Sequence, residues 1–170
     1  MSLSLYQASI PVYLRGLGVL STLLEKAEAH AEQGGIVPEV LLGAQLAPDM
    51  LDLTAQVQRA SDTSKLSGQR LSGVAAPKFD DNEVSFDQLQ QRIANTASYL
   101  RGLDPAHFDG AASRTITLPL GGSEKQFNGE DYLLTFALPN FFFHLAMAHG
   151  ILRNHGVQIG KLDYLGPFDA

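Results

Sequence analysis

Apolar residues alternate at intervals of three and four, without a miss, along the first part of the chain. The positions are Leu3, Tyr6, Ile10, Tyr13, Leu17, Leu20, Leu24 and Ala27. This spacing brings the side chains onto one face of an α-helix, which the helix can then bury. Pro11 within the segment predicts a kink or a late start, and the pair Gly34-Gly35 predicts the end. The segment predicts a long helix that needs partners to cover its apolar face.

Two later segments repeat this alternation and provide such partners. A short helix is expected over residues 37–47, and Pro48 then begins a longer one, because proline is tolerated in a first turn. Ser85 and Gln88 form a capping box that begins the next helix. The first of these two long stripes comprises Met50, Leu53, Val57, Ala60, Ser64, Ser67, Leu71 and Val74. The second comprises Phe86, Leu89, Ile93, Thr96, Leu100 and Leu103.

The last long helix is predicted over residues 129–155, and it is apolar almost all round. Asn128 is a helix-capping residue at its start, and Pro139 predicts a kink within it. A helix that is apolar on every face is either central or shared with a second subunit, so we expect a homodimer through this helix. Before it, the turn at Gly121-Gly122 predicts a β-hairpin, and the tail after residue 156 predicts an extended strap.

Together these elements predict an all-α protein. The expected architecture is an antiparallel four-helix bundle formed by one domain over residues 1–170. A small β-hairpin lies between the third and fourth helices, and the C-terminal strap covers the bundle.

Composition excludes several classes of function. The chain has no cysteine, which rules out disulfides, thiolate metal sites and cysteine nucleophiles. With 12 Lys and Arg against 18 Asp and Glu, its net charge of −6 argues against nucleic acid and anionic lipid as partners. No apolar run reaches the roughly 18 residues of a membrane span. We therefore expect a cytoplasmic protein without a membrane partner.

Three of the five histidines lie in the last helix, but their spacing forms no chelate. His144 and His149 are about 140° apart around a regular helix, and His144 and His155 about 16 Å apart along it. A metal-binding pair needs a spacing of three or four, and the position four after His144 is Ala148. His144 remains a candidate, either as a pocket residue or as a core histidine with one hydrogen-bond partner.

Polar residues recur every seven positions along the second long helix, next to its apolar stripe. They are Asp49, Gln56, Thr63 and Arg70, with Asp52 and Arg59 on the opposite shoulder. A side chain of this line that points inward needs a hydrogen-bond partner, and His144 and Asn140 are the natural ones. Asp49, Gln56, Asn140 and His144 form the candidate ligand-binding set. For Asp49, capping the helix N-terminus is the alternative.

Three stretches of the chain resemble a known family. The stretches ASIPVYLRGLGVLSTLLEKA, LAPDMLDLTAQVQRASDTSK and LPNFFFHLAMAHGILRNHGVQIGKLDYLG resemble an uncharacterised bacterial domain-of-unknown-function family, grouped with the DinB/YfiT-like four-helix bundles. That superfamily is described as metalloenzymes, some of them thiol-dependent transferases, with one histidine early in helix two and two spaced by four on the last helix. Only His144 matches this motif, so the resemblance implies the fold with an altered pocket.

These observations leave two main functions and one further role open. The first is small-molecule binding in a cleft near His144, without a complete three-histidine site. The alternative is a thiol-transferase or hydrolase dependent on a divalent metal, zinc or nickel, held by His144 with Asp49 or Asp52. Metal analysis after tag-free purification discriminates between them. The further role is a structural or interaction role in which the last helix forms a homodimer interface, and light scattering tests it. The sequence identifies neither the ligand nor a reaction.

Overall fold

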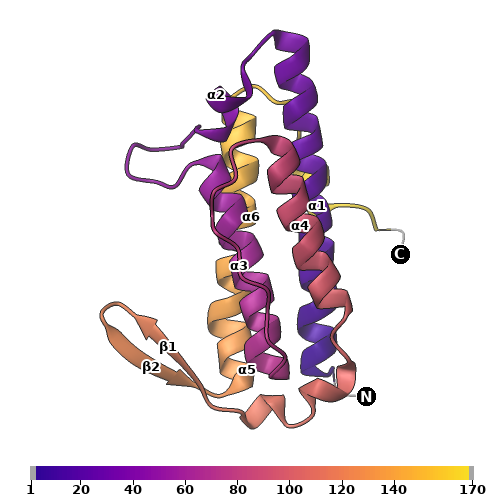
Figure 1. The fold of residues 1–170 in the computed structure, drawn as a ribbon, viewed down its shortest axis with the longest axis vertical. Helices are drawn as coiled ribbons and strands as arrows, with labels where there is room; N and C mark the ends of the chain where they lie inside the picture. Colours follow the sequence, from indigo (N-terminus) through magenta and orange to yellow (C-terminus); the bar gives the residue numbers. More distant parts are fainter. Residues whose placement is uncertain (1–2, 169–170) are drawn as a thin grey trace.

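The computed structural model describes residues 3–168 and is mainly helical, with one small antiparallel sheet (Figure 1). Four long helices lie side by side: α1 (Leu5–Gly34), α3 (Leu53–Ser72), α4 (Phe86–Arg101) and α6 (Leu138–Asn154). The shorter helices are α2 (Pro38–Leu42), α5 (Gly129–Asp131), α7 (Lys161–Leu165), η1 (Pro105–Phe108) and η2 (Ala111–Ser113). A π-helical segment, η3 (Tyr132–Ala137), joins α5 to α6, and strands β1 (Ile116–Leu120) and β2 (Ser123–Phe127) form the hairpin.

The first helix begins where its cap dictates. The Ser4 hydroxyl accepts from the Gln7 backbone N–H, and the Gln7 side chain accepts from the Ser4 N–H, which forms a capping box. Gly35, at φ 62°, ends the helix in the left-handed conformation that glycine adopts without strain. The helix runs through Pro11 from Leu5 onward, so the predicted late start is wrong.

The second long helix starts later than Pro48. Asp52 is its N-cap and accepts from the Ala55 N–H at 2.8 Å, so α3 begins at Leu53. Met50 N–H bonds to the Ala47 carbonyl in a turn, which takes Pro48 and its neighbours out of the helix. The short helix α2 likewise ends at Leu42 instead of reaching residue 47.

Small residues in the second half of α3 let its neighbours approach closely. A Cβ on Gly68 would lie 3.0 Å from the side chains of Leu100 and Leu103. On α1, Tyr13 is fully buried, donates to Ser67 Oγ at 2.9 Å and meets Phe141 of α6 edge to face. The polar half of this stripe is therefore packed against α1 and α4.

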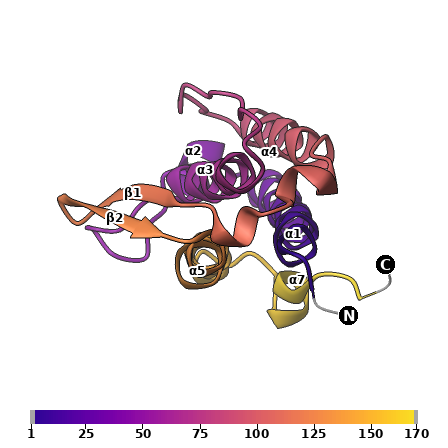
Figure 2. The same cartoon turned by 90° about the horizontal axis from the view of Figure 1, so that it is seen from below.

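The hairpin and α7 lie on different sides of the long helices (Figure 2). Ile116 pairs with Phe127 and Leu120 with Ser123, as expected for a hairpin that turns at residues 121 and 122. The C-terminal strap is not fully extended, because residues 161–165 form α7 and pack against α1. Lys26 holds α7 through Asp163 at 2.5 Å, and Arg15 donates to the carbonyl oxygens of residues 165 and 167.

The apolar last helix is partly exposed. The continuous helical stretch Gly129–Asn154 is long and apolar enough, by length and composition alone, to cross a membrane, contrary to the sequence-based expectation. This stretch packs against α3, and 28% of its most apolar window is buried. Leu134, Phe142 and Phe143 on its outer side are 37–53% exposed.

Candidate functional site

Three hydrogen bonds join α3 to the facing helix at regular intervals. We call this set of six side chains the polar seam. The bonds link Gln56 to His144 at 2.8 Å, Thr63 to Asn140 at 2.8 Å, and Arg70 to Tyr132 at 3.1 Å. On α3 the partners are seven residues apart, so they share one side of the helix. Residue numbers rise on α3 as they fall on α6 and η3, so the two helices run antiparallel.

At one end of the polar seam, Gln56 fixes the tautomer of His144. The Gln56 side-chain NH₂ donates to the Leu51 carbonyl at 3.1 Å, which turns its Oε1 toward the imidazole. Because Oε1 can only accept, Nδ1 of His144 carries the hydrogen, and Nε2 keeps its lone pair. Of the two partners considered for an inward-pointing Gln56, His144 and Asn140, the structure shows His144.

The second nitrogen of His144 is open. Within residues 3–168, every fully buried side-chain nitrogen or oxygen has a hydrogen-bond partner. Nε2 of His144 makes no hydrogen bond to these residues, so it is not fully buried, although the side chain as a whole is only 9% exposed. An oriented imidazole with one open, basic nitrogen can accept a hydrogen bond, take a proton or ligate a metal.

The charge state of His144 follows from its surroundings. Burial lowers the pKa of His144 below its ordinary value, and the nearby positive charge of Arg59 lowers it further. The ring is therefore neutral at pH 7, which keeps Nε2 an acceptor.

We expect the titration midpoint of His144 to lie below pH 6.5, its ordinary pKa. Its folded pKa is depressed, so its contribution to stability is full above pH 6.5 and is lost as pH falls through the folded pKa. Titration of the His144 ring protons by NMR measures this directly. A His144 midpoint at or above pH 6.5 would contradict the prediction.

The middle of the polar seam borders a cleft of about 230 Å³ between α3, the hairpin and η3. Asn140 and Thr63 bridge its floor, and the Asn140 bond uses only the NH₂ group of the amide. The remaining lining is apolar on the hairpin side and charged on α3, where Asp62 accompanies two arginines. Its members include Arg59, Leu66, Arg70, Leu118, Leu120 and Phe136.

A π-helical segment forms one wall of this cleft. The irregularity expected at Pro139 takes the form of η3, which ends at Ala137 just ahead of that proline. Such π-helical turns occur often at functional sites, since they alter the direction of side chains that follow. Here the segment contributes Phe136 to the cleft and Tyr132 to the polar seam.

The two aspartates proposed as metal ligands lie at and just before the start of α3. Asp49 is exposed in the loop before α3, and it does not cap that helix, because Asp52 does. Asp52 directs its carboxylate to the Ala55 N–H. Across the described range 3–168, no group of three or more His, Cys, Asp or Glu side chains is placed to hold a metal ion.

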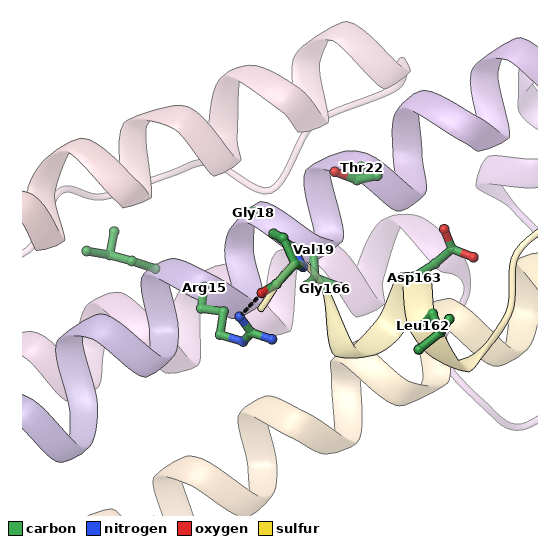
Figure 3. A pocket seen from close by; sticks show the side chains of 9 residues that line it. Arg15, Gly18, Val19, Thr22, Leu162, Asp163 and Gly166 are labelled. Atoms are coloured by element: carbon green, nitrogen blue, oxygen red, sulfur yellow. Dashed lines mark hydrogen bonds between the residues drawn. The ribbon is translucent and has the colours of Figure 1, made fainter. Parts of the chain in front are cut away.

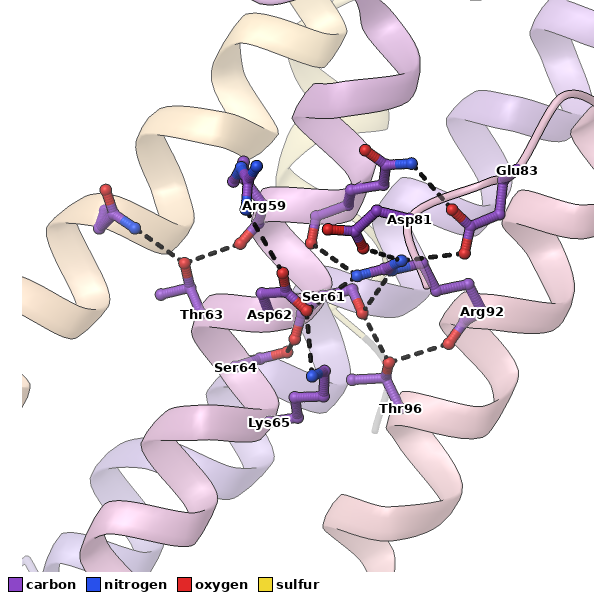
Figure 4. Close-up of polar contacts among 12 residues, drawn as sticks. Arg59, Ser61, Asp62, Thr63, Ser64, Lys65, Asp81, Glu83, Arg92 and Thr96 are labelled. Atoms are coloured by element: carbon purple, nitrogen blue, oxygen red, sulfur yellow. Dashed lines mark hydrogen bonds and ion pairs between the residues drawn. The ribbon is translucent and has the colours of Figure 1, made fainter. Parts of the chain in front are cut away.

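A buried arginine on α4 was missed by the sequence reasoning (Figure 4). Arg92 is 2% exposed and binds three carboxylates, Asp62 at 2.8 Å, Asp81 at 2.6 Å and Glu83 at 2.9 Å. Its position, three after Leu89 and four before Thr96, lies on the apolar stripe. That spacing was the signal that could have placed it inside.

A larger cavity, of about 470 Å³, lies between α1 and α7 (Figure 3). Its charged lining residues are already engaged, Arg15 with backbone carbonyls and Asp163 with Lys26. It includes no member of the polar seam. The cleft beside the polar seam is therefore the stronger candidate site.

Comparison with known proteins places this geometry in a family. The model of the family described as a domain of unknown function, DUF1993, matches residues 5–165. The chain belongs to the DUF1993 family. This DUF1993 chain is similar to a solved protein from Shewanella denitrificans described as a DinB family member. The two are 40% identical, with a TM-score of 0.92 over 98% of this chain and 94% of that one. A search of curated proteins finds no match. The resemblance to a DinB-like family of unknown function is thus confirmed.

Proposed function

We propose that this DUF1993 protein binds a small organic molecule in the cleft beside the polar seam. The observation that carries the proposal is the Asn140 amide, held by Thr63 along one side of a cleft that is apolar on its hairpin side. His144, oriented and neutral, lies four residues after Asn140 on α6 and outside the residues that line the cleft. Small-molecule sites combine an apolar lining with a few polar groups that fix the orientation of the ligand. The cleft is smaller than the roughly 300 Å³ of drug-sized sites, which favours a small ligand.

The proposal treats the four long helices as an antiparallel four-helix bundle in a cytoplasmic bacterial protein. The order of the hydrogen-bonded pairs along the polar seam supports the antiparallel arrangement of α3 and α6. A homodimer through α6 is part of the same proposal, supported by the exposed Leu134, Phe142 and Phe143. Light scattering at high concentration checks it, and a monomer would contradict it.

Binding is tested by ¹H–¹⁵N NMR with a mixed set of neutral, anionic and cationic fragments. We expect shifts at the Asn140 side-chain amide and at the backbone of residues 118 and 120. The variant Leu66→Phe fills the cleft and is expected to abolish these shifts. Leu162→Phe, the same exchange in the cavity beside α7, is the control and is expected to leave them unchanged.

Two results would overturn the proposal. One is fragment binding that Leu162→Phe abolishes and Leu66→Phe does not, which would move the site to the cavity between α1 and α7. The other is stoichiometric zinc or nickel in tag-free protein that is lost in His144→Ala. That result would favour the metal-dependent alternative, in which His144 is a ligand.

A further inference from the structure

The charges around the cleft leave one cation without a carboxylate partner. Asp62 is the acidic residue of the lining, and it is shared by Arg59 at 3.6 Å, Lys65 at 3.1 Å and Arg92 at 2.8 Å (Figure 4). Arg92 also binds Asp81 and Glu83, so three cations and three carboxylates balance in this cluster. Arg70 stands outside it: no carboxylate of residues 3–168 lies within 4.0 Å of its guanidinium.

Arg70 is not needed by the end of its own helix. A cation near a helix C-terminus ordinarily interacts with the last carbonyl groups. At the end of α3 this place is taken by Arg114, whose guanidinium donates to the carbonyls of Leu71 and Arg70. Side chains on a helix point back toward its N-terminus, which from Arg70 is the direction of Leu66 and Thr63 in the cleft lining.

The guanidinium of Arg70 is held in place without being neutralised. It donates one hydrogen bond to the hydroxyl of Tyr132 and lies 5.7 Å from the centre of that ring. Tyr132 is fully buried, so it provides a fixed support. A guanidinium has five N–H donors, and the bond to Tyr132 uses only one.

We infer that the ligand of this cleft is an apolar monocarboxylate whose carboxylate pairs with Arg70. This inference rests on the proposed function. One unbalanced positive charge matches one negative charge, and the planar guanidinium matches a carboxylate in a two-bond arrangement. Leu66, Leu118, Leu120 and Phe136 provide the surface for the apolar part of the ligand. A phosphate monoester, with a charge between −1.5 and −2 at pH 7, would leave excess negative charge.

The inference is tested with three six-carbon probes, hexanoate, hexan-1-ol and hexyl phosphate, titrated into the full chain at pH 7. The readout is again the Asn140 side-chain amide by NMR. We expect hexanoate to bind at least about ten times more tightly than hexanol, and more tightly than hexyl phosphate. Arg70→Gln is expected to remove the preference for hexanoate over hexanol, and Arg70→Lys to retain part of it.

Arg153→Gln removes the same charge from an exposed position on α6 and is the matched control. Thermal melting establishes that the Arg70 variants fold. Equal binding of hexanoate and hexanol to the cleft would overturn the inference and leave the proposed function standing. Tighter binding of hexyl phosphate than of hexanoate would overturn the inference, because it would identify the anionic group of the ligand as a phosphate. If no probe and no fragment perturbs the cleft, the proposed function fails as well.

Discussion

Gly129→Ala is expected to destabilise the protein by about 3 kcal/mol or more. Gly129 begins α5, and a Cβ added there would lie 1.9 Å from the Ala111 carbonyl oxygen. Because the position of a Cβ is fixed by the backbone and the Ala111 carbonyl is itself backbone, no side-chain rotation relieves the overlap, and the segment that enters η3 and α6 must shift. Overpacking of a well-packed site costs about 1–3 kcal/mol, occasionally more, and a backbone overlap lies at the upper end.

The matched control is Gly18→Ala on α1, where the added Cβ has no atom within 4 Å. In a helix, alanine is about 1 kcal/mol more favourable than glycine, so this exchange is expected to stabilise the protein. Urea denaturation with linear extrapolation measures both free energies of unfolding. The same direction of change in both variants would contradict the packing of Gly129 against Ala111.

The order of helices could be predicted from spacing because each long helix buries a stripe. Leu17 and Leu53 are fully buried, as the three–four alternation requires. Helix ends were harder to predict. Pro48 and Asp52 are both residue types that favour a helix start, and spacing alone does not choose between them. In the structure Leu53 is buried and its N–H bonds to the Ala44 carbonyl, so the helix starts after Asp52.

The candidate site was predicted in part for the same reason. The heptad spacing of Gln56, Thr63 and Arg70 is a local property of one helix, so it can be counted along the chain. Asp49 continues that count but lies outside α3, because the helix begins four residues after it. The partners on the other side depend on the register between α3 and α6, and the η3 segment sets that register for Tyr132.

The hairpin's contribution to the cleft could not be predicted. Its turn was evident from Gly121-Gly122, but nothing local in Leu118 or Leu120 specifies which helix they will face. The contacts between the hairpin and the helices depend on the path of the segment between α4 and β1, which sets the position of the strands. The same holds for the cavity under α7, which forms because Arg15 and Lys26 of α1 bind the chain end.

We expect Arg92→Met to cost about 3–5 kcal/mol of stability, the range for breaking a buried ion pair by removing one partner. The guanidinium is 2% exposed and also donates to Ser61 Oγ at 3.1 Å, so its loss leaves Asp62 and Glu83 without their cation. Arg101→Met, an exposed charge on the same helix, is the control and is expected to change stability by less than about 0.5 kcal/mol. Chemical denaturation at pH 7 compares the two.

The stability difference between Arg92→Met and the parent protein is expected to shrink in acid. Burial raises the pKa of Glu83, but its bonds from Arg92 and Gln58 outweigh burial and hold the pKa below its ordinary value. A depressed carboxyl pKa stabilises the fold above the unfolded pKa, about 4.3, and that stabilisation is lost as pH falls through the folded pKa. A difference that stays constant from pH 7 to pH 3 would contradict this account of Glu83.

The same variant connects the buried cluster to the cleft. Asp62 is shared by three cations whose charges balance those of Asp62, Asp81 and Glu83, which leaves Arg70 as the unbalanced charge. Without Arg92, the negative charge of Asp62 is less compensated and repels a carboxylate in the same cleft. We therefore expect folded Arg92→Met to bind hexanoate more weakly and hexanol equally well. Unchanged hexanoate binding would show that Asp62 does not contribute to the charge balance that selects the ligand.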